Sequence, residues 1–112
     1  MILLINIMVK HVSVQQLKTI IDYGKDYSIV DVRESQEYTA VRISGSLLVP
    51  LSQFEEKINL IDNNKPAYFL CGVGKRALKA AEYLELKGYK NLLVIEGGIK
   101  AWIEAGYPVE CN

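Results

Sequence analysis

Short apolar runs alternate with amphipathic segments along the chain, and each run has the length of a strand. Four runs show little polar alternation, at residues 27–32, 47–49, 67–70 and 92–95. Runs of this kind are typical of parallel strands that are covered on both faces. They therefore predict four strands of one sheet.

The segments between these runs carry signals for helices. Ser13 and Gln16 form a capping-box pattern at the start of a helix that Gly24 ends. Ser35 is expected to cap a short helix that reaches about Ala40.

Three further helices are predicted in the second half. Ser52 and Glu55 form another capping-box pattern. A helix over about 75–87 has a buried stripe of small residues, and Gly97-Gly98 opens a last helix that ends at Gly106. The expected buried stripe of the helix over 75–87 is Ala77, Ala80, Ala81 and Leu84; the apolar residues of the other two helices are Phe54, Ile58, Ile61, Ile99, Trp102 and Ile103.

This alternation predicts an α/β fold: a single compact domain over residues 1–112, with a central parallel sheet of four or five strands and helices on both faces. The core is expected over about residues 12–109. Met1–Met8 is mostly apolar but lacks the basic start and cleavage site of a signal peptide, and it is too short to span a bilayer. We expect it to form an N-terminal arm or an extra strand.

Composition narrows the function. Half of the 112 residues are apolar, and 13 basic residues balance 13 acidic ones. A neutral chain argues against nucleic-acid and membrane-surface partners, which usually require a basic excess. Two cysteines in unlike contexts do not make a disulfide scaffold, so a reducing, cytoplasmic setting is expected. The sequence shows no obvious exposed apolar stripe, so a monomer is expected.

The segment after the third apolar run contains the strongest candidate for chemistry. Cys71 is followed by Gly72, Val73, Gly74, Lys75 and Arg76. Glycines let backbone N–H groups turn inward, and a helix N-terminus adds unpaired donors and partial positive charge. With two basic residues nearby, the Cys71 thiol is expected to ionise readily, to be reachable by solvent and to act as a nucleophile. The alternative is a small buried hydrophobe, as an isolated cysteine often is.

Other polar candidates have simpler explanations. Asp31 and Arg33 stand at a strand end, where an ion pair is usually structural. His11 has no cysteine or second histidine nearby, so neither a metal site nor a cysteine–histidine dyad is expected. Cys111 is next to last and is interpreted as an incidental thiol in a flexible tail.

In order and spacing, several segments resemble the rhodanese-like domains. The resemblance covers about residues 12–109. It rests on Asp31-Val32-Arg33-Glu34 with Glu37-Tyr38, on Ile43-Ser44-Gly45-Ser46 before Pro50, on Cys71 to Arg76, and on Gly88-Tyr89, Glu96-Gly97-Gly98-Ile99, Ala101-Trp102 and Ala105-Gly106-Tyr107-Pro108.

The resemblance implies a thiosulfate sulfurtransferase that needs no metal or other cofactor. The Cys71 thiolate would take the outer sulfur of thiosulfate or of a persulfide, and would pass it to cyanide or to a thiol, including a protein thiol. Residues 72–76 would form the cradle, with Lys75 and Arg76 attracting the anionic donor. Asp31, Arg33 and Arg42 are candidates for supporting roles. Arg42 lies where the family often has Gly-His-Ile-Pro-Gly-Ala and this chain has Val41-Arg42-Ile43-Ser44-Gly45-Ser46.

Three alternatives remain open from sequence. The first is a persulfide relay that never meets thiosulfate, and the second is a non-catalytic module that binds a partner. The third is a cysteine phosphatase or an arsenate reductase on the same fold. Such phosphatases and reductases have one more residue between cysteine and arginine than the four that separate Cys71 from Arg76. The shorter loop suits one sulfur atom better than a phosphate.

Overall fold

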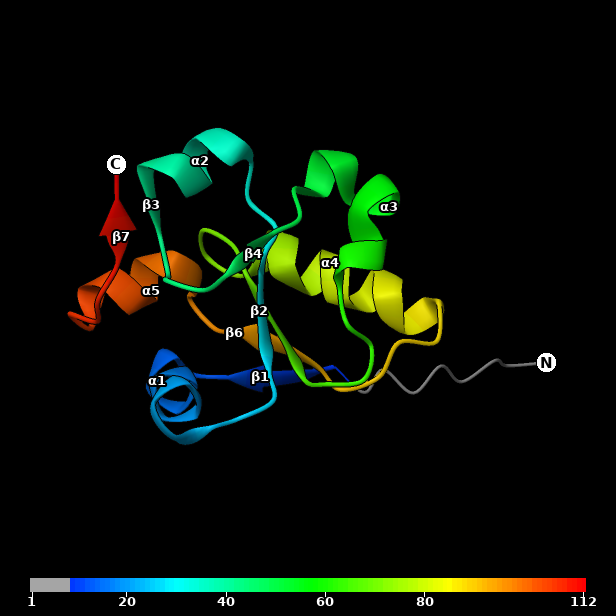
Figure 1. The fold of residues 1–112 in the computed structure, drawn as a ribbon, viewed down its shortest axis with the longest axis horizontal. Coiled ribbons are helices and arrows are strands. Elements are labelled where there is room, and N and C mark those ends of the chain that lie inside the picture. The colour runs from blue at the N-terminus through cyan, green and yellow to red at the C-terminus, as the bar shows by residue number, and fades with distance from the viewer. Residues whose placement is uncertain (1–8) are drawn as a thin grey trace.

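The structure, a computed structural model, describes residues 9–112, and its centre is a five-stranded sheet in the order β1-β6-β5-β2-β4. All neighbouring strands are parallel (Figure 1). The four apolar runs coincide with strands, so the predicted parallel sheet is confirmed. The strands are β1 (Lys10–Val12), β2 (Ser28–Asp31), β4 (Leu47–Leu48), β5 (Ala67–Leu70) and β6 (Leu92–Ile95).

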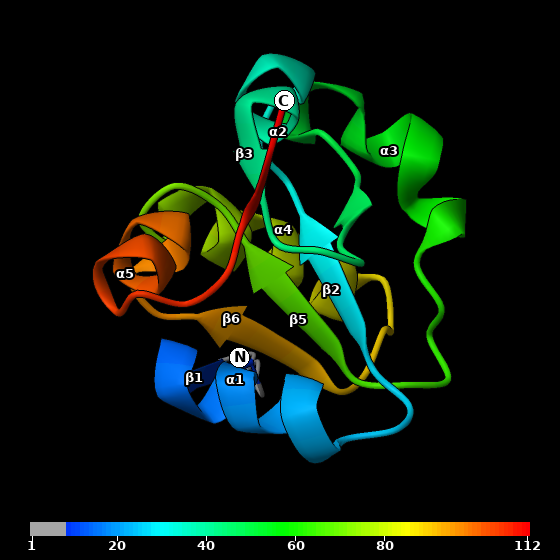
Figure 2. The same ribbon diagram turned by 60° about the vertical axis from the view of Figure 1, so that its left-hand side comes forward.

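Helices cover both faces of this sheet, as predicted. Helix α4 lies behind the strands in the view of Figure 2, and α1 lies in front of them. The helices are α1 (Val14–Tyr23), α2 (Ser35–Ala40), α3 (Phe54–Lys57), α4 (Lys75–Leu86) and α5 (Gly98–Glu104), with the 3-10 turns η1 (Leu51–Gln53) and η2 (Ile58–Leu60) on either side of α3.

Strand alternation divides the core into two clusters, one on each face. Along β5, Phe69 points into the cluster that includes the small side chains of α4, whereas Tyr68 and Leu70 point into the cluster with α1 and α5. This alternation continues by one residue beyond β5, so Cys71 belongs to the α4 side. The predicted buried positions of α4, namely Ala77, Ala80, Ala81 and Leu84, are all buried.

Of the three side-chain caps predicted at helix starts, one agrees with the structure and two differ. Ser13 and Gln16 make both hydrogen bonds of the capping box. The N-cap of α2 is Glu34 instead of Ser35, and its N–H donates to Glu37 Oε1. The Ser52–Glu55 capping box is wrong, because the Ser52 hydroxyl donates to Glu34 Oε1 at 2.5 Å and the segment begins as the 3-10 turn η1.

Two features were not predicted. Strand β1 is too short to show a pattern, and it pairs with β6 at the sheet edge. Strands β3 (Val41–Arg42) and β7 (Glu110–Cys111) form an antiparallel ribbon between segments far apart in sequence (Figure 1). Cys111 is therefore exposed in a paired strand, and the expected flexible tail is wrong at this position.

The expected arm at Met1–Met8 lies outside the described residues. Within residues 9–112, no helix is long and apolar enough to cross a bilayer.

Candidate active site

The Cys71 side chain lies where β5 ends and α4 begins, and backbone amides point at its sulfur. The N–H groups of Gly74 and Ala77 donate to Cys71 Sγ at 3.0 and 3.3 Å. The Gly74 amide belongs to the loop and the Ala77 amide to the first turn of α4, so one donor of each expected kind reaches the sulfur. Two donors on one sulfur stabilise negative charge there, whether on a thiolate or on a persulfide.

The sulfur occupies the place of a missing helix cap. Gly74 is the N-cap of α4 and has no side chain to accept a hydrogen bond from the first turn. Ala77 is the third helical residue, whose N–H an N-cap side chain normally satisfies. Cys71 Sγ takes that role from three residues upstream, which places the sulfur at the positive end of the helix dipole.

Cys71 is also buried, with 1% of the residue exposed. The expectation of a sulfur that faces solvent is wrong in this conformation. The reason is the strand alternation, which turns the side chain toward α4 and the buried Ala77. Val73, two residues later in the same loop, is 56% exposed.

The two loop glycines serve different purposes. Gly74 has φ +113°, a conformation that strongly favours glycine, and this conformation aims its N–H at the sulfur. Gly72 has no positive φ. Its role is close approach, because a Cβ there would stand 3.1 Å from Arg76 Nη2.

Helix α5 supports the loop from its other side, which the sequence reasoning did not identify. The N–H groups of Ile99 and Lys100 donate to the carbonyls of Cys71 and Gly72 at 2.9 and 3.2 Å. Gly98 lies directly against these carbonyls. The Gly97-Gly98 pair was the available signal, because consecutive glycines before a helix also mark a close backbone approach.

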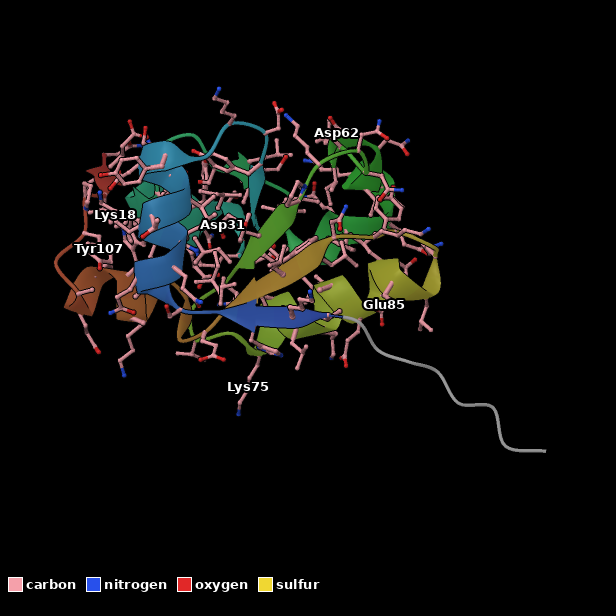
Figure 3. All side chains as sticks on the ribbon, turned by 90° about the horizontal axis from the view of Figure 1, so that it is seen from below. Lys18, Asp31, Asp62, Lys75, Glu85 and Tyr107 are labelled. Carbon is pink, nitrogen blue, oxygen red and sulfur yellow. The ribbon has the colours of Figure 1, made fainter. Side chains whose placement is uncertain are left out.

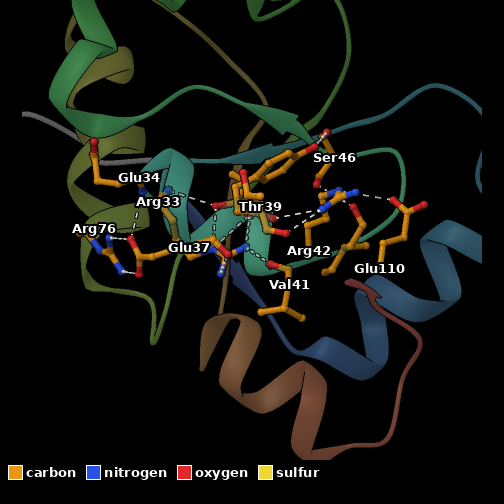
Figure 4. A network of polar contacts seen from close by, with 12 residues as sticks. Arg33, Glu34, Glu37, Thr39, Val41, Arg42, Ser46, Arg76 and Glu110 are labelled. Carbon is orange, nitrogen blue, oxygen red and sulfur yellow. Dashed lines mark hydrogen bonds and ion pairs between the residues drawn. The ribbon is translucent and has the colours of Figure 1, made fainter. Parts of the chain in front are cut away.

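Arg76 forms an ion pair that the sequence reasoning also missed. Its Nη1 and Nη2 donate to Glu37 Oε1 and Oε2 at 2.8 and 3.0 Å, joining α4 to α2 (Figure 4). The hydrogen bond from Arg76 is the main cause that lowers the pKa of Glu37 to about 2, against an ordinary value of 4.5. The same pairing raises the pKa of Arg76. Lys75 is exposed and projects away from the body of the protein (Figure 3).

Asp31 and Arg33 form a buried ion pair at the end of β2. Arg33 Nη2 lies 2.8 Å from Asp31 Oδ2, and its Nε donates to the same carboxylate. The remaining guanidinium donors reach the carbonyls of Glu37 and Val41. The pair therefore fixes the backbone of α2 and β3, and through α2 it positions Glu37 (Figure 4).

Arg42 is not brought to the cysteine loop. Its guanidinium donates to the carbonyls of Tyr38 and Thr39 at the end of α2, and it pairs with Glu110 of β7 at 3.7 Å. These contacts satisfy helix carbonyls and hold the β3–β7 ribbon. Within residues 9–112, no group of three or more His, Cys, Asp and Glu side chains is placed to hold a metal ion.

Comparison with known proteins agrees with this architecture. A model of the rhodanese-like domain matches residues 13–105. The chain belongs to the rhodanese-like domain family. A rhodanese-related protein from Thermoplasma volcanium is similar in structure, with a TM-score of 0.83 and 33% identity over 92% of this chain and 99% of that one.

Curated relatives in this family are named for sulfur transfer. YtwF of Bacillus subtilis, named as a candidate sulfurtransferase, is 31% identical over 84% of this chain and 90% of its own length. The thiosulfate sulfurtransferase GlpE of Shewanella oneidensis is 30% identical over 86% of this chain and 94% of its own length. The chain spans only about half, 51%, of another relative, the candidate sulfur carrier protein YrkF of Bacillus subtilis.

Proposed function

We propose that this rhodanese-like domain is a sulfurtransferase that carries sulfane sulfur as a persulfide on Cys71. The single observation that carries the proposal is the pair of amides, from Gly74 and Ala77, directed at Cys71 Sγ. The named activities of YtwF, GlpE and YrkF support the same class of reaction.

The reaction has two steps. With thiosulfate, the Cys71 thiolate attacks the outer sulfur, a new S–S bond forms at Sγ, and the old S–S bond breaks to release sulfite. With an organic persulfide, the thiolate takes the terminal sulfur and a thiolate leaves. A thiol or cyanide then attacks the outer sulfur of the enzyme persulfide and regenerates the Cys71 thiolate. A reducing compartment such as the cytoplasm suits this cycle, because it keeps the thiol available.

The residues we assign to the site are Cys71 as the nucleophile and residues 72–76 as its cradle. Gly74 and Ala77 stabilise the sulfur anion, and Arg76 borders the loop at Gly72. Because Cys71 is 1% exposed, a donor reaches its sulfur only after a local rearrangement of the site. Asp31 and Arg33 act indirectly, by holding α2 in place.

The phosphatase alternative fits less well. A phosphate cradle needs an arginine that forks toward the bound oxyanion. Here Nη1 and Nη2 of Arg76 both donate to Glu37, so this edge of the guanidinium is already engaged. Turnover of p-nitrophenyl phosphate that disappears in Cys71→Ser would favour the phosphatase over our proposal.

The deciding experiment is intact-mass spectrometry after incubation with thiosulfate or with an organic persulfide. One added sulfur, about 32 Da, is expected from thiolate chemistry, and cyanide should remove it. Cys71→Ser should take up no sulfur. The matched control is Cys111→Ser, which removes the exposed thiol of β7 and should load like the wild type.

The proposal would be overturned if neither donor adds sulfur to the wild-type protein. It would also fail if the added sulfur stays on Cys71→Ser and is lost from Cys111→Ser. If Cys71 takes up sulfur but transfers none to cyanide or to a small thiol, the protein is a sulfur carrier, as in the relay alternative.

A further inference from the structure

The ion pair between Glu37 and Arg76 changes the charge that a donor meets at the site. From sequence, Lys75 and Arg76 look like two free cations beside the cysteine. In the structure Nη1 and Nη2 of Arg76 donate hydrogen bonds to the two carboxylate oxygens of Glu37. Glu37 Oε1 also accepts the N–H of Glu34, so the carboxylate is held in place by its own helix.

Glu37 remains ionised under any ordinary assay condition, since its pKa is about 2. The Arg76 guanidinium stands at the loop itself, because its Nη2 is 3.1 Å from where a Cβ of Gly72 would be. The other basic residue of the loop, Lys75, projects into solvent (Figure 3). Apart from the solvent-directed Lys75, the border of the loop therefore presents a neutral pair, so its net charge is one positive unit lower than the sequence suggests.

The loop also presents an apolar contact. Val73 is 56% exposed at its tip, between the half-buried Gly72 and Gly74. An exposed valine offers nothing to a small inorganic dianion, which is strongly hydrated and has no carbon atoms. It can pack against the carbon skeleton of a larger donor.

We propose that Glu37 is a specificity-determining residue that disfavours thiosulfate and favours an organic persulfide as the donor to Cys71. This inference rests on the proposed sulfur-transfer function. The favoured step is the attack of the Cys71 thiolate on the terminal sulfur of R–S–SH. The Sγ–S bond forms, the S–S bond of the donor breaks, and R–S⁻ leaves with its electron pair while the proton stays on the enzyme persulfide.

Thiosulfate brings two negative charges to the border, and Glu37 repels them while it cancels the attraction of Arg76. An organic persulfide brings at most one charge on its sulfur, and its carbon chain contacts Val73. The protein therefore discriminates between the two donors by charge repulsion at Glu37 and by apolar packing at Val73.

The test compares second-order rate constants for sulfur loading of Cys71, followed by intact mass, with thiosulfate and with 2-hydroxyethyl persulfide. The variant is Glu37→Gln, because glutamine retains the capping hydrogen bond and an oxygen for Arg76 but loses the charge. We expect the rate constant with thiosulfate to rise about three- to ten-fold and that with the persulfide to change less than about two-fold.

Glu34→Gln is the matched control. It removes the same charge three residues earlier, from a carboxylate that binds Ser52 instead of Arg76. Its ratio of the two rate constants should equal that of the wild type. Increasing salt should slow thiosulfate loading more steeply in Glu37→Gln than in the wild type, because the variant has one more unit of net positive charge at the border to attract the dianion.

Arg76→Gln gives a prediction of opposite sign and covers the case in which Glu37→Gln does not fold. It leaves the Glu37 charge uncompensated, so loading by thiosulfate should slow more than loading by the persulfide. The inference is overturned if the donor ratio is the same in wild type, Glu37→Gln and Arg76→Gln, or if both donors respond equally. Absence of loading by either donor in the wild type would instead defeat the proposed function itself.

Discussion

Gly98 lies against the backbone of Cys71 so closely that a side chain at position 98 would collide with it. A Cβ built on Gly98 would be 2.4 Å from the Cys71 carbonyl oxygen and 2.5 Å from that of Gly72. The N–H of Ile99 donates to the same Cys71 carbonyl. The cysteine loop is thus held between α4, whose amides point at the sulfur, and α5, whose first residues support the backbone.

Gly98→Ala should therefore damage both the fold and the site. The methyl group has to push away two backbone carbonyls, and φ at position 98 is +59°, which alanine adopts at a cost. We expect the free energy of unfolding to fall by at least about 2 kcal/mol, and sulfur loading of Cys71 to slow. Urea denaturation and the loading rate measured by intact mass check this.

Gly106→Ala tests the cost of a left-handed backbone conformation alone, without the steric collision expected at Gly98. Gly106 has φ +79°, but a Cβ there would meet nothing within 4 Å. This variant should lose about 1 kcal/mol of stability for the left-handed conformation and should load sulfur like the wild type. Equal losses in the two variants would contradict the packing role of Gly98.

The buried pair of Asp31 and Arg33 leads to a prediction about stability. Both side chains are almost fully buried, at 0% and 3% exposed, and each is the main charged partner of the other. Arg33→Met should cost about 3 to 5 kcal/mol, because it leaves the Asp31 carboxylate buried without a counter-charge. The measurement is the free energy of unfolding in urea.

A double-mutant cycle tests the cause of that loss. Asp31→Asn combined with Arg33→Met removes both charges, and it should be less destabilised than the sum of the two single variants. Strictly additive losses would show that Arg33 stabilises only through the carbonyls of Glu37 and Val41.

The sheet and the position of the nucleophile could be predicted from sequence because they depend on local patterns. Four apolar runs coincided with strands, and the small residues of α4 were recognised from helical spacing. The placement of Cys71 after β5 follows directly from these patterns. Its burial also follows from the sheet being covered on both faces, because the residue that continues β5 points into one of the two buried clusters whichever way it faces.

Contacts between segments far apart in sequence could not be predicted in this way. The partner of Arg76 is 39 positions upstream, and nothing in the local pattern distinguishes Glu37 from other surface acids. Likewise, β3 and β7 have two residues each, too few to show alternation, and Val41 pairs with Cys111, 70 positions later in the chain. Such features depend on tertiary packing, which decides pairings that local propensity leaves open.

The Glu37–Arg76 pair predicts how stability responds to acid. The pKa of Glu37 is about 2 in the folded protein and 4.5 ordinarily, so the unfolded chain binds this proton first as the pH falls. The stabilisation from Glu37 is present above about pH 5 and is lost between pH 5 and pH 2. Because the pair is about two-fifths exposed, solvent screening limits its contribution to stability to about 1 kcal/mol.

Urea denaturation of the wild type and of Glu37→Gln should be measured from pH 6 to pH 2.5. The difference in their free energies of unfolding should shrink as the pH falls, and Arg76→Gln should respond to acid as Glu37→Gln does. Parallel stability curves for wild type and Glu37→Gln would mean that the ion pair does not stabilise the folded protein.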